Sequence, residues 1–228
     1  MREMSLLFPN GLSKALTLSY DDGVEQDIRL VGIMNKYGLK GTFNLSGGLF
    51  APEGTVYPPG QIHRRMTKNA AYDLYANSGH EVALHAYTHP DLTLLSPGTA
   101  AYQIVKDRET LEEMFGRIVR GMAYPYGTNS ADTADLLRHC GVAYCRTVEA
   151  TCRFDIPTDW LRMPSTCHHN HPRLMELAKA TGEDRWQEAA EKLLDGLIDH
   201  CCDWSEERCG ILTHCTASYH DDGAGRHT

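Results

Sequence analysis

The chain has 228 residues and a formal net charge of −8, from 22 Lys and Arg against 30 Asp and Glu. This acidic balance gives no electrostatic reason to bind nucleic acid or an anionic membrane surface, and an uncharged or cationic small substrate suits it better. The length fits one large α/β domain with a substantial buried core, so we predict a single domain over residues 1–228.

The N-terminal stretch and the cysteines both bear on the compartment. Few apolar residues precede Pro9 and Gly11, so the stretch lacks the long apolar run of a signal peptide or membrane anchor, and we predict a cytosolic protein. All eight cysteines fall in the second half of the chain and none has a CxxC spacing, a poor pattern for a zinc ribbon. In a reducing compartment this favours free thiols over a disulfide framework.

Predicted strands and helices alternate along most of the chain. Residues 15–20 alternate apolar and polar positions as a half-buried strand does, and apolar residues then recur at helical spacing from Leu30 to Tyr37, before Gly38. The same reasoning predicts strands at 41–45, 81–85, 118–124, 142–146 and 210–214, and helices near 69–77, 98–115, 131–139, 172–180 and 184–200. Repeated strand–helix units indicate a mostly parallel sheet, either closed as a barrel or open and doubly wound.

Two adjacent carboxylates, Asp21 and Asp22, follow the first predicted strand. Catalytic groups gather at the carboxyl ends of strands in parallel α/β folds. Two carboxylates held close together are costly unless a cation or a proton divides their roles, so one could bind a metal while the other takes a proton from water. The alternative is a plain turn at Asp22-Gly23 that caps the following helix.

Two histidines, His85 and His89, follow the strand predicted at 81–85. An H-x-x-x-H spacing places both imidazoles on one face of a helical turn, close enough to chelate one ion, and imidazole suits zinc, cobalt or nickel. Two histidines and a carboxylate with open positions describe a catalytic metal site better than a structural one. The alternative is a pair of surface histidines at a turn before Pro90.

The segment Pro125-Tyr126-Gly127 follows a third predicted strand. Proline fixes the backbone and glycine frees it, so this loop could present a backbone N–H to a developing oxyanion, with Tyr126 as a wall of the substrate site. Taken alone, the pattern is that of an ordinary turn. Three such segments at three strand ends favour one joint site.

In this order the three segments resemble the motifs of the polysaccharide deacetylases, carbohydrate esterases that remove acetyl groups from N-acetylated sugars and peptidoglycan. The family motif T-F-D-D-G resembles residues 19–23, which implies that Asp21 is the catalytic base and Asp22 a metal ligand. The motif H-[ST]-x-x-H resembles residues 85–89, which implies that His85 and His89 complete the ligands of one divalent ion. Zinc is the expected metal, with cobalt or nickel as alternatives.

The resemblance also implies a fold and a reaction. The expected fold is an α/β, variant (β/α) barrel of about seven strands, with the metal at the carboxyl-end face. The expected enzyme is a metal-dependent hydrolase of amide bonds, removing N-acetyl or O-acetyl groups from an N-acetylated sugar, oligosaccharide or polysaccharide. Asp21 would take a proton from the attacking water, and the backbone N–H of Tyr126 would share the charge of the tetrahedral intermediate.

Two positions depart from the family motifs. Ala86 stands where the second motif has Ser or Thr, and Ala123 stands where the third motif, R-x-P-Y-G, has the arginine that orients the base. We expect Arg162 to partner Asp21 instead, because it lies in a stretch that resembles the fourth motif. In the same stretch, Trp160 would offer an apolar face to the acetyl group or sugar ring, or be an ordinary core tryptophan.

The last part of the chain resembles the family least. Gly210 to His214 is similar to the fifth motif, an apolar strand that ends in the general-acid histidine, which implies that His214 protonates the departing amine; His220 is the alternative. Residues 176–228 are therefore expected to form a divergent C-terminal part of the domain.

Three other functions compete with the deacetylase prediction. A hydrolase of a small cyclic amide or ureide on the same fold is favoured by the predicted cytosolic location and by the missing motif-three arginine. A catalytically silent carbohydrate-binding protein is an alternative from another class. A purely structural metal domain conflicts with a set of only three good ligands.

Overall fold

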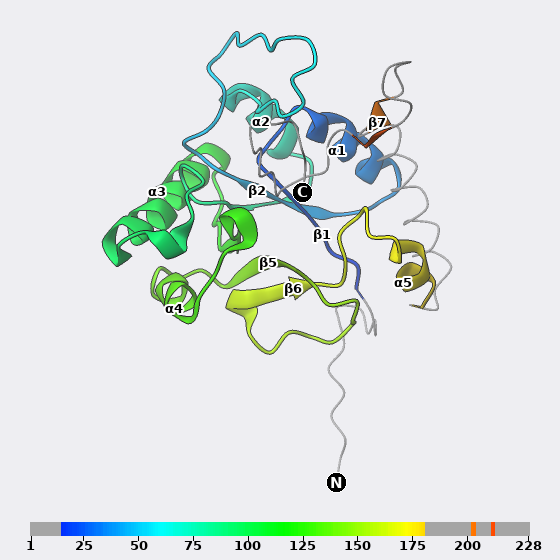
Figure 1. Ribbon diagram of the computed structural model, residues 1–228. Coiled ribbons are helices and arrows are strands. Elements are labelled where there is room, and N and C mark those ends of the chain that lie inside the picture. Colours follow the sequence, from blue (N-terminus) through cyan, green and yellow to red (C-terminus); the bar gives the residue numbers. More distant parts are fainter. Residues whose placement is uncertain (1–14, 181–201, 204–210, 213–228) are drawn as a thin grey trace.

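The computed structural model describes residues 15–180, 202–203 and 211–212. In this part of the chain, six parallel strands form one sheet in the order β1-β2-β3-β4-β5-β6. The sheet is curled into a half-barrel with helices α1 to α4 around its outside (Figure 1). The predicted α/β barrel-like fold is confirmed, and the described sheet has six strands where about seven were expected.

The elements follow the predicted alternation of strand and helix. The strands of the sheet are β1 (Leu18–Asp21), β2 (Gly41–Leu45), β3 (Glu81–Leu84), β4 (Gly121–Ala123), β5 (Tyr144–Ala150) and β6 (Met163–Ser165). The α-helices are α1 (Gln26–Lys36), α2 (Lys68–Tyr75), α3 (Pro97–Phe115), α4 (Ala131–His139) and α5 (Leu174–Ala180), and the short 3₁₀ turns are η2 (Leu92–Leu94), η3 (Pro125–Gly127) and η4 (Trp160–Arg162). A separate antiparallel pair joins β7 (Cys202–Asp203) to β8 (Ile211–Leu212), which falls within the strand predicted at 210–214. The helix predicted at 184–200 lies outside the described residues.

Local sequence explains where the longest helix begins and ends. The Ser96 hydroxyl accepts a hydrogen bond from the Thr99 N–H at 3.3 Å, and Pro97 occupies the first helical turn of α3, where its missing N–H costs nothing. Gly116 ends the helix at φ 63°, a left-handed conformation that glycine adopts without a steric penalty. None of the helices in the described ranges is long and apolar enough to cross a membrane.

The core fills the space between the sheet and its helices. Its largest fully buried side chains come from the strands (Phe43, Leu45, Leu84 and Met122), from the helices (Met34, Tyr75, Ile104, Leu111 and Leu137) and from the connecting segments (Met66, His80 and Tyr124). This packing holds the strands in register, so that their carboxyl ends meet at one edge of the half-barrel.

Asp27 is one of three buried aspartates in the described residues. Asp27 in α1 is only 1% exposed, and its carboxylate accepts a hydrogen bond of 2.7 Å from the Tyr75 hydroxyl. Burial raises the pKa of Asp27 from 3.8 to about 7, although the Tyr75 hydrogen bond acts in the opposite direction. The folded protein therefore holds a proton on Asp27 at pH values where the unfolded chain has released it.

This proton makes stability depend on pH. Between pH ~4 and ~7 the folded state binds more protons than the unfolded state, so we expect Asp27 to lower the free energy of unfolding by about 1.4 kcal/mol per pH unit as the pH rises. Above pH ~7 this contribution levels off. Urea unfolding of the wild type and of Asp27→Asn at pH 5, 6, 7 and 8 measures it, since asparagine can still accept from Tyr75 but does not titrate. Identical pH dependence in the two proteins would contradict the raised pKa.

Candidate metal centre

The predicted site residues lie at the carboxyl ends of neighbouring strands. Asp21 is the last residue of β1 and Asp22 follows it, His85 follows β3, and Tyr126 lies in η3 just after β4. Because parallel strands end at the same edge of the sheet, these four residues meet there although they are far apart in sequence.

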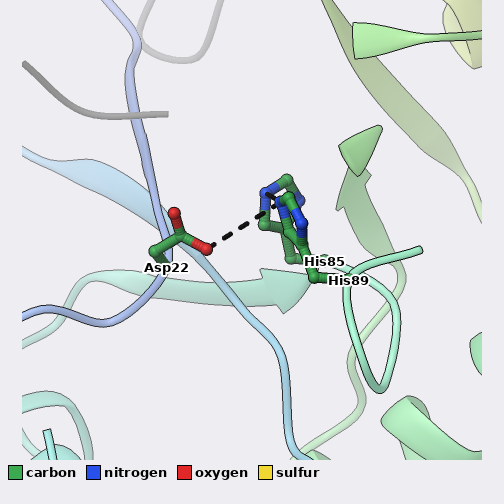
Figure 2. A group of neighbouring side chains, drawn as sticks. All are labelled: Asp22, His85 and His89. Atoms are coloured by element: carbon green, nitrogen blue, oxygen red, sulfur yellow. Dashed lines mark hydrogen bonds and ion pairs between the residues drawn. The ribbon is translucent and has the colours of Figure 1, made fainter. Parts of the chain in front are cut away.

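Asp22, His85 and His89 form a compact group of ligand atoms (Figure 2). One ligand atom from each residue lies within 4.8 Å of the others. The Nε2 atoms of His85 and His89 are 3.1 Å apart, and Nε2 of His89 is 3.9 Å from Oδ1 of Asp22. The structure thus brings together the three residues that were predicted to bind a metal.

Left-handed backbone conformations help to orient the side chains of Asp22, His85 and His89. The φ angles are 77° at Asp22, 60° at Ala86 and 52° at His89, and each costs a non-glycine residue about 1 kcal/mol or more. The spacing predicted that the two histidines lie on a helical turn, and this prediction is wrong. An irregular turn carries them, because the left-handed residues reverse the chain and His89 N–H bonds to the Ala86 carbonyl at 3.2 Å.

The chemistry of the three donors fits a divalent transition metal. Nδ1 of His85 lies 2.8 Å from the Ala123 carbonyl, which can only accept, so Nδ1 carries the proton and Nε2 keeps a free lone pair. Burial lowers the pKa of His89 to about 4, so its ring is neutral at pH 7. Two imidazoles and a carboxylate that converge in this way match the ligand preferences of zinc.

Asp22 stays ionised despite its buried position. Burial raises the pKa of Asp22, but the hydrogen bond with His63 and the positive charge of Arg65 outweigh it, and the pKa lies well below 3.8. The Asp22 carboxylate therefore keeps its negative charge across the physiological pH range.

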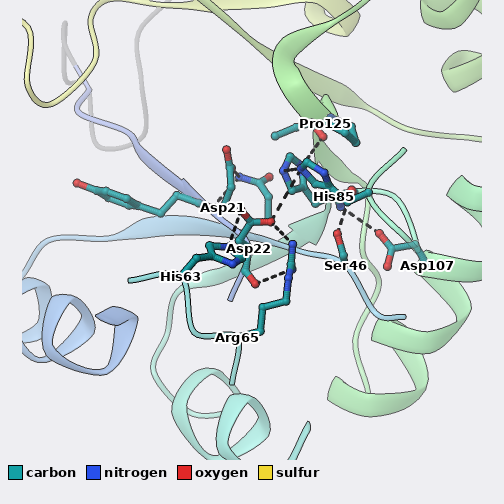
Figure 3. Close-up of polar contacts among 12 residues, drawn as sticks. Asp21, Asp22, Ser46, His63, Arg65, His85, Asp107 and Pro125 are labelled. Atoms are coloured by element: carbon teal, nitrogen blue, oxygen red, sulfur yellow. Dashed lines mark hydrogen bonds and ion pairs between the residues drawn. The ribbon is translucent and has the colours of Figure 1, made fainter. Parts of the chain in front are cut away.

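A buried acid and a hydroxyl support the backbone around His85 (Figure 3). The Asp107 carboxylate in α3 accepts from the N–H of His85 at 3.0 Å and from the N–H of Gly47 at 2.6 Å. The Ser46 hydroxyl donates to the His85 carbonyl at 3.1 Å. These contacts tie the carboxyl ends of β2 and β3 together and support the loop in which Ala86 replaces the family's Ser or Thr.

Asp21 is paired with an arginine that the sequence reasoning missed. Asp21 is only 3% exposed, and Nη2 of Arg146 donates to both of its carboxylate oxygens, with 2.5 Å to Oδ2. Nδ2 of Asn44 donates to Oδ1 at 2.8 Å, and Nε of Arg146 also binds the Ser19 hydroxyl at 2.9 Å. Asp21 is thus held firmly beside Asp22 without being part of the ligand group.

The prediction that Arg162 partners Asp21 is wrong. Arg162 lies in η4, where its Nε donates to Asp159 Oδ2 at 2.7 Å, a local pair three residues apart. Arg146 on β5 takes the place because it is directly opposite Ala123 in the β4–β5 register. Paired residues on adjacent parallel strands point to the same face of the sheet, so a guanidinium from either position reaches the same space.

The remaining predicted residues differ in where they lie. The Tyr126 ring contacts the His89 ring at 4.6 Å between centroids, which brings the third motif to the candidate metal ligands. Trp160 is 51% exposed in η4, which packs against β5 and α4, so it is not a core tryptophan, and its contact with substrate stays a prediction. His214 and His220 lie outside the described residues.

A segment between β2 and α2 brings two further side chains to Asp22, and neither was among the predicted site residues. Nη1 of Arg65 donates to the backbone carbonyl of Asp22 at 2.9 Å, and Nη2 donates to Oδ1 at 2.6 Å. Nε2 of His63 lies 3.2 Å from Oδ2 of the same carboxylate. Figure 3 shows both side chains directed at Asp22. They belong to the chain that leaves a Gly- and Pro-rich loop, where periodicity carries no information.

Comparisons with known proteins point to one family. The polysaccharide deacetylase family model matches residues 9–145, which is more than half of the chain. The peptidoglycan-N-acetylglucosamine deacetylase PgdA of Listeria monocytogenes is 24% identical over 125 residues, which cover 54% of this chain and 24% of that protein. A peptidoglycan-N-acetylglucosamine deacetylase of Bacillus cereus is 26% identical over 114 residues, covering 49% of this chain and 36% of the relative. The match thus spans about a quarter to a third of these relatives.

Solved structures share the fold. The Streptococcus pyogenes deacetylase PplD, in complex with acetate, has a TM-score of 0.57 at 20% identity and covers 69% of this chain and 66% of its own. A family 4 carbohydrate esterase from Streptomyces lividans, also with acetate, has a TM-score of 0.51 at 16% identity, with coverages of 81% and 88%. The fold, the ligand geometry and the family match lead to one conclusion: the chain belongs to the polysaccharide deacetylase family.

Proposed function

We propose that this protein is a metal-dependent hydrolase that removes acetyl groups from N-acetylated sugars. One observation carries the proposal: a buried carboxylate, Asp21, is held by Arg146 next to three converging metal donors and is not one of them. The site therefore separates a proton acceptor from a metal ligand. Two relatives are named peptidoglycan-N-acetylglucosamine deacetylases, which supports an acetylated amino sugar as the substrate.

The donors Asp22, His85 and His89 would hold one divalent ion, and we favour zinc over cobalt or nickel. When bound, such an ion supplies Lewis-acid chemistry, which polarises an amide carbonyl and makes water more acidic. Three protein donors leave positions open, as a catalytic site requires.

The protein side chains would carry out the proton transfers. Asp21 accepts a proton from the water whose oxygen forms a new bond to the acetyl carbon. Arg146 keeps the carboxylate oriented for this step, since both oxygens are bound to its guanidinium group. The backbone N–H of Tyr126 is proposed to bind the developing oxyanion. The carbon–nitrogen bond then breaks, acetate leaves, and the amine receives a proton, for which His214 remains the proposed donor.

Arg146 weakens the case for a cyclic-amide or ureide hydrolase. That alternative was favoured by the absence of an arginine before the Pro125-Tyr126-Gly127 segment. The structure supplies the guanidinium from β5 instead, so the absence no longer distinguishes the two substrates. We propose N-acetylated oligosaccharides or polysaccharides as substrates.

Acetate release tests the proposal. Protein loaded with Zn²⁺ or Co²⁺ is incubated with N-acetylglucosamine oligomers of one to six units, and free acetate is measured enzymatically. We expect acetate release to stop after treatment with a chelator and to return when metal is added back. The proposed reaction needs the ion that Asp22, His85 and His89 would hold, because these side chains alone supply no Lewis acid. No release above the Asp21→Ala blank, from protein that binds metal stoichiometrically, would contradict the assigned reaction.

A further inference from the structure

We propose that Arg65 is a positioning residue for Asp22, and that it fixes the carboxylate of the metal centre in its binding orientation before the metal arrives. The inference rests on the proposed metal centre and adds a segment outside the three motif regions to it. It follows from the contacts of one guanidinium group with both the backbone and the side chain of Asp22.

Arg65 holds two parts of the same residue. Its Nη1 donates to the Asp22 carbonyl at 2.9 Å and its Nη2 donates to Oδ1 at 2.6 Å. Because the guanidinium is planar and rigid, these two bonds fix the carboxylate relative to its own backbone. Asp22 needs such a constraint, since its φ of 77° is unfavourable for any residue with a side chain.

The other carboxylate oxygen is also bound from the same segment. Nε2 of His63 lies 3.2 Å from Oδ2, while Oδ1 faces His89 at 3.9 Å. The side chains of Arg65 and Asp22 are 18% and 11% exposed, so water competes little for their contact. His63 and Arg65 therefore leave the carboxylate one well-defined orientation, which faces the two histidines.

The segment that carries these side chains is attached to the chain just after β1. The Glu25 N–H bonds to the Arg64 carbonyl at 2.8 Å, and the Met66 N–H bonds to the Gly23 carbonyl at 2.8 Å. Val24 and Arg65 form an isolated antiparallel bridge. Arg65 thus approaches Asp22 from a fixed backbone, as a positioning role requires.

Charge and geometry act in opposite directions here, and they can be separated. A guanidinium close to the centre repels a divalent cation, whereas its two-point contact holds the ligand in place. Arg65→Lys keeps the positive charge but cannot present two parallel N–H donors, so it removes only the geometric contribution. Arg64→Lys is the matched control, because Arg64 lies on the same segment but pairs with Glu25, at 2.6 Å, and not with Asp22.

The experiment is Co²⁺ binding to apo-protein, measured by isothermal titration calorimetry and by the visible spectrum of the bound ion. We expect Arg65→Lys to weaken Co²⁺ binding by about 10-fold and to change the spectrum, as outer contacts of metal ligands typically do when removed. Arg64→Lys should bind within about twofold of the wild type. His63→Ala, which removes a partly exposed side chain, should weaken binding by a smaller factor and serves as the second variant if Arg65→Lys unfolds.

The outcomes separate this inference from the proposed function. Wild-type protein that binds no Co²⁺ would overturn the metal centre and the positioning role together. Wild-type binding with equal affinity and equal spectra in Arg65→Lys and Arg64→Lys would overturn the positioning role alone. Tighter binding by Arg65→Lys would also overturn it.

Discussion

Replacing Arg146 by alanine is expected to lower kcat/KM for acetate release by about 100-fold or more, because the buried Asp21 carboxylate loses its charged partner and keeps, of the contacts described above, only the one from the Asn44 amide. Asp21 is 3% exposed, and Nη2 of Arg146 contacts both of its oxygens. Initial rates on an N-acetylglucosamine oligomer measure the effect. Arg162→Ala is the matched control, because its guanidinium pairs with Asp159 in a largely exposed position. Equal losses in the two variants would contradict the role of Arg146.

Two forms of rescue distinguish this role from a structural one. Guanidinium ions added to Arg146→Ala should restore part of the rate, since they fit the space left by the side chain. The double variant Ala123→Arg/Arg146→Ala should also recover activity, because the two positions are paired across β4 and β5. Loss of a buried partner costs about 3–5 kcal/mol of stability, so urea unfolding must accompany the rate measurements. Arg146→Lys, which keeps the charge, is the variant to use if the alanine protein does not fold.

Replacing Asp21 by asparagine is expected to lower kcat by about 10³-fold while Co²⁺ still binds, since general-base catalysis contributes about 10²- to 10⁴-fold. Asparagine keeps the shape of the side chain and an oxygen that can accept from Asn44 or Arg146, but it cannot take up the proton. Calorimetry with Co²⁺ and the acetate assay on the same preparation measure the two effects separately.

The comparison variant for this prediction is Asp22→Asn, which should lose most of its metal affinity because a charged ligand is replaced by a neutral one. The two adjacent carboxylates thus give opposite results in the binding assay. If Asp21→Asn abolished Co²⁺ binding and Asp22→Asn retained it, the assignment of base and ligand would be reversed.

Local patterns were sufficient to predict a mostly parallel α/β sheet and candidate site residues, and the family resemblance then implied the barrel-like fold and the role of each residue. Strand and helix periods alternate strongly, and parallel strands bring their carboxyl ends together, so Asp21, Asp22 and His85 could be placed at one edge without coordinates. The H-x-x-x-H spacing correctly indicated that the side chains of His85 and His89 lie close together. It wrongly indicated a helical turn, since a spacing does not reveal the left-handed conformations of Ala86 and His89.

The support for the site could not be predicted, because it depends on register and on loop geometry. Arg146 and Ala123 become neighbours only through the pairing of β4 with β5, which no single stretch of sequence encodes. Arg65 reaches Asp22 from a loop without hydrophobic periodicity. Asp107 reaches His85 from the middle of a helix, and the sequence pattern of that helix does not mark it as part of a site. In each case the sequence did not indicate which distant residue would contact the site residue in the folded chain.

The pairing of Ala123 with Arg146 also constrains how such a site evolves. One guanidinium neutralises the buried Asp21; two would place repelling charges on a single carboxylate, and none would leave it bare. A lineage that moves its arginine from one strand to the other must therefore pass through a sequence that is less stable or less active. We expect relatives to carry arginine at one of these two positions and a small residue at the other, so that the two arrangements mark separate branches of the family.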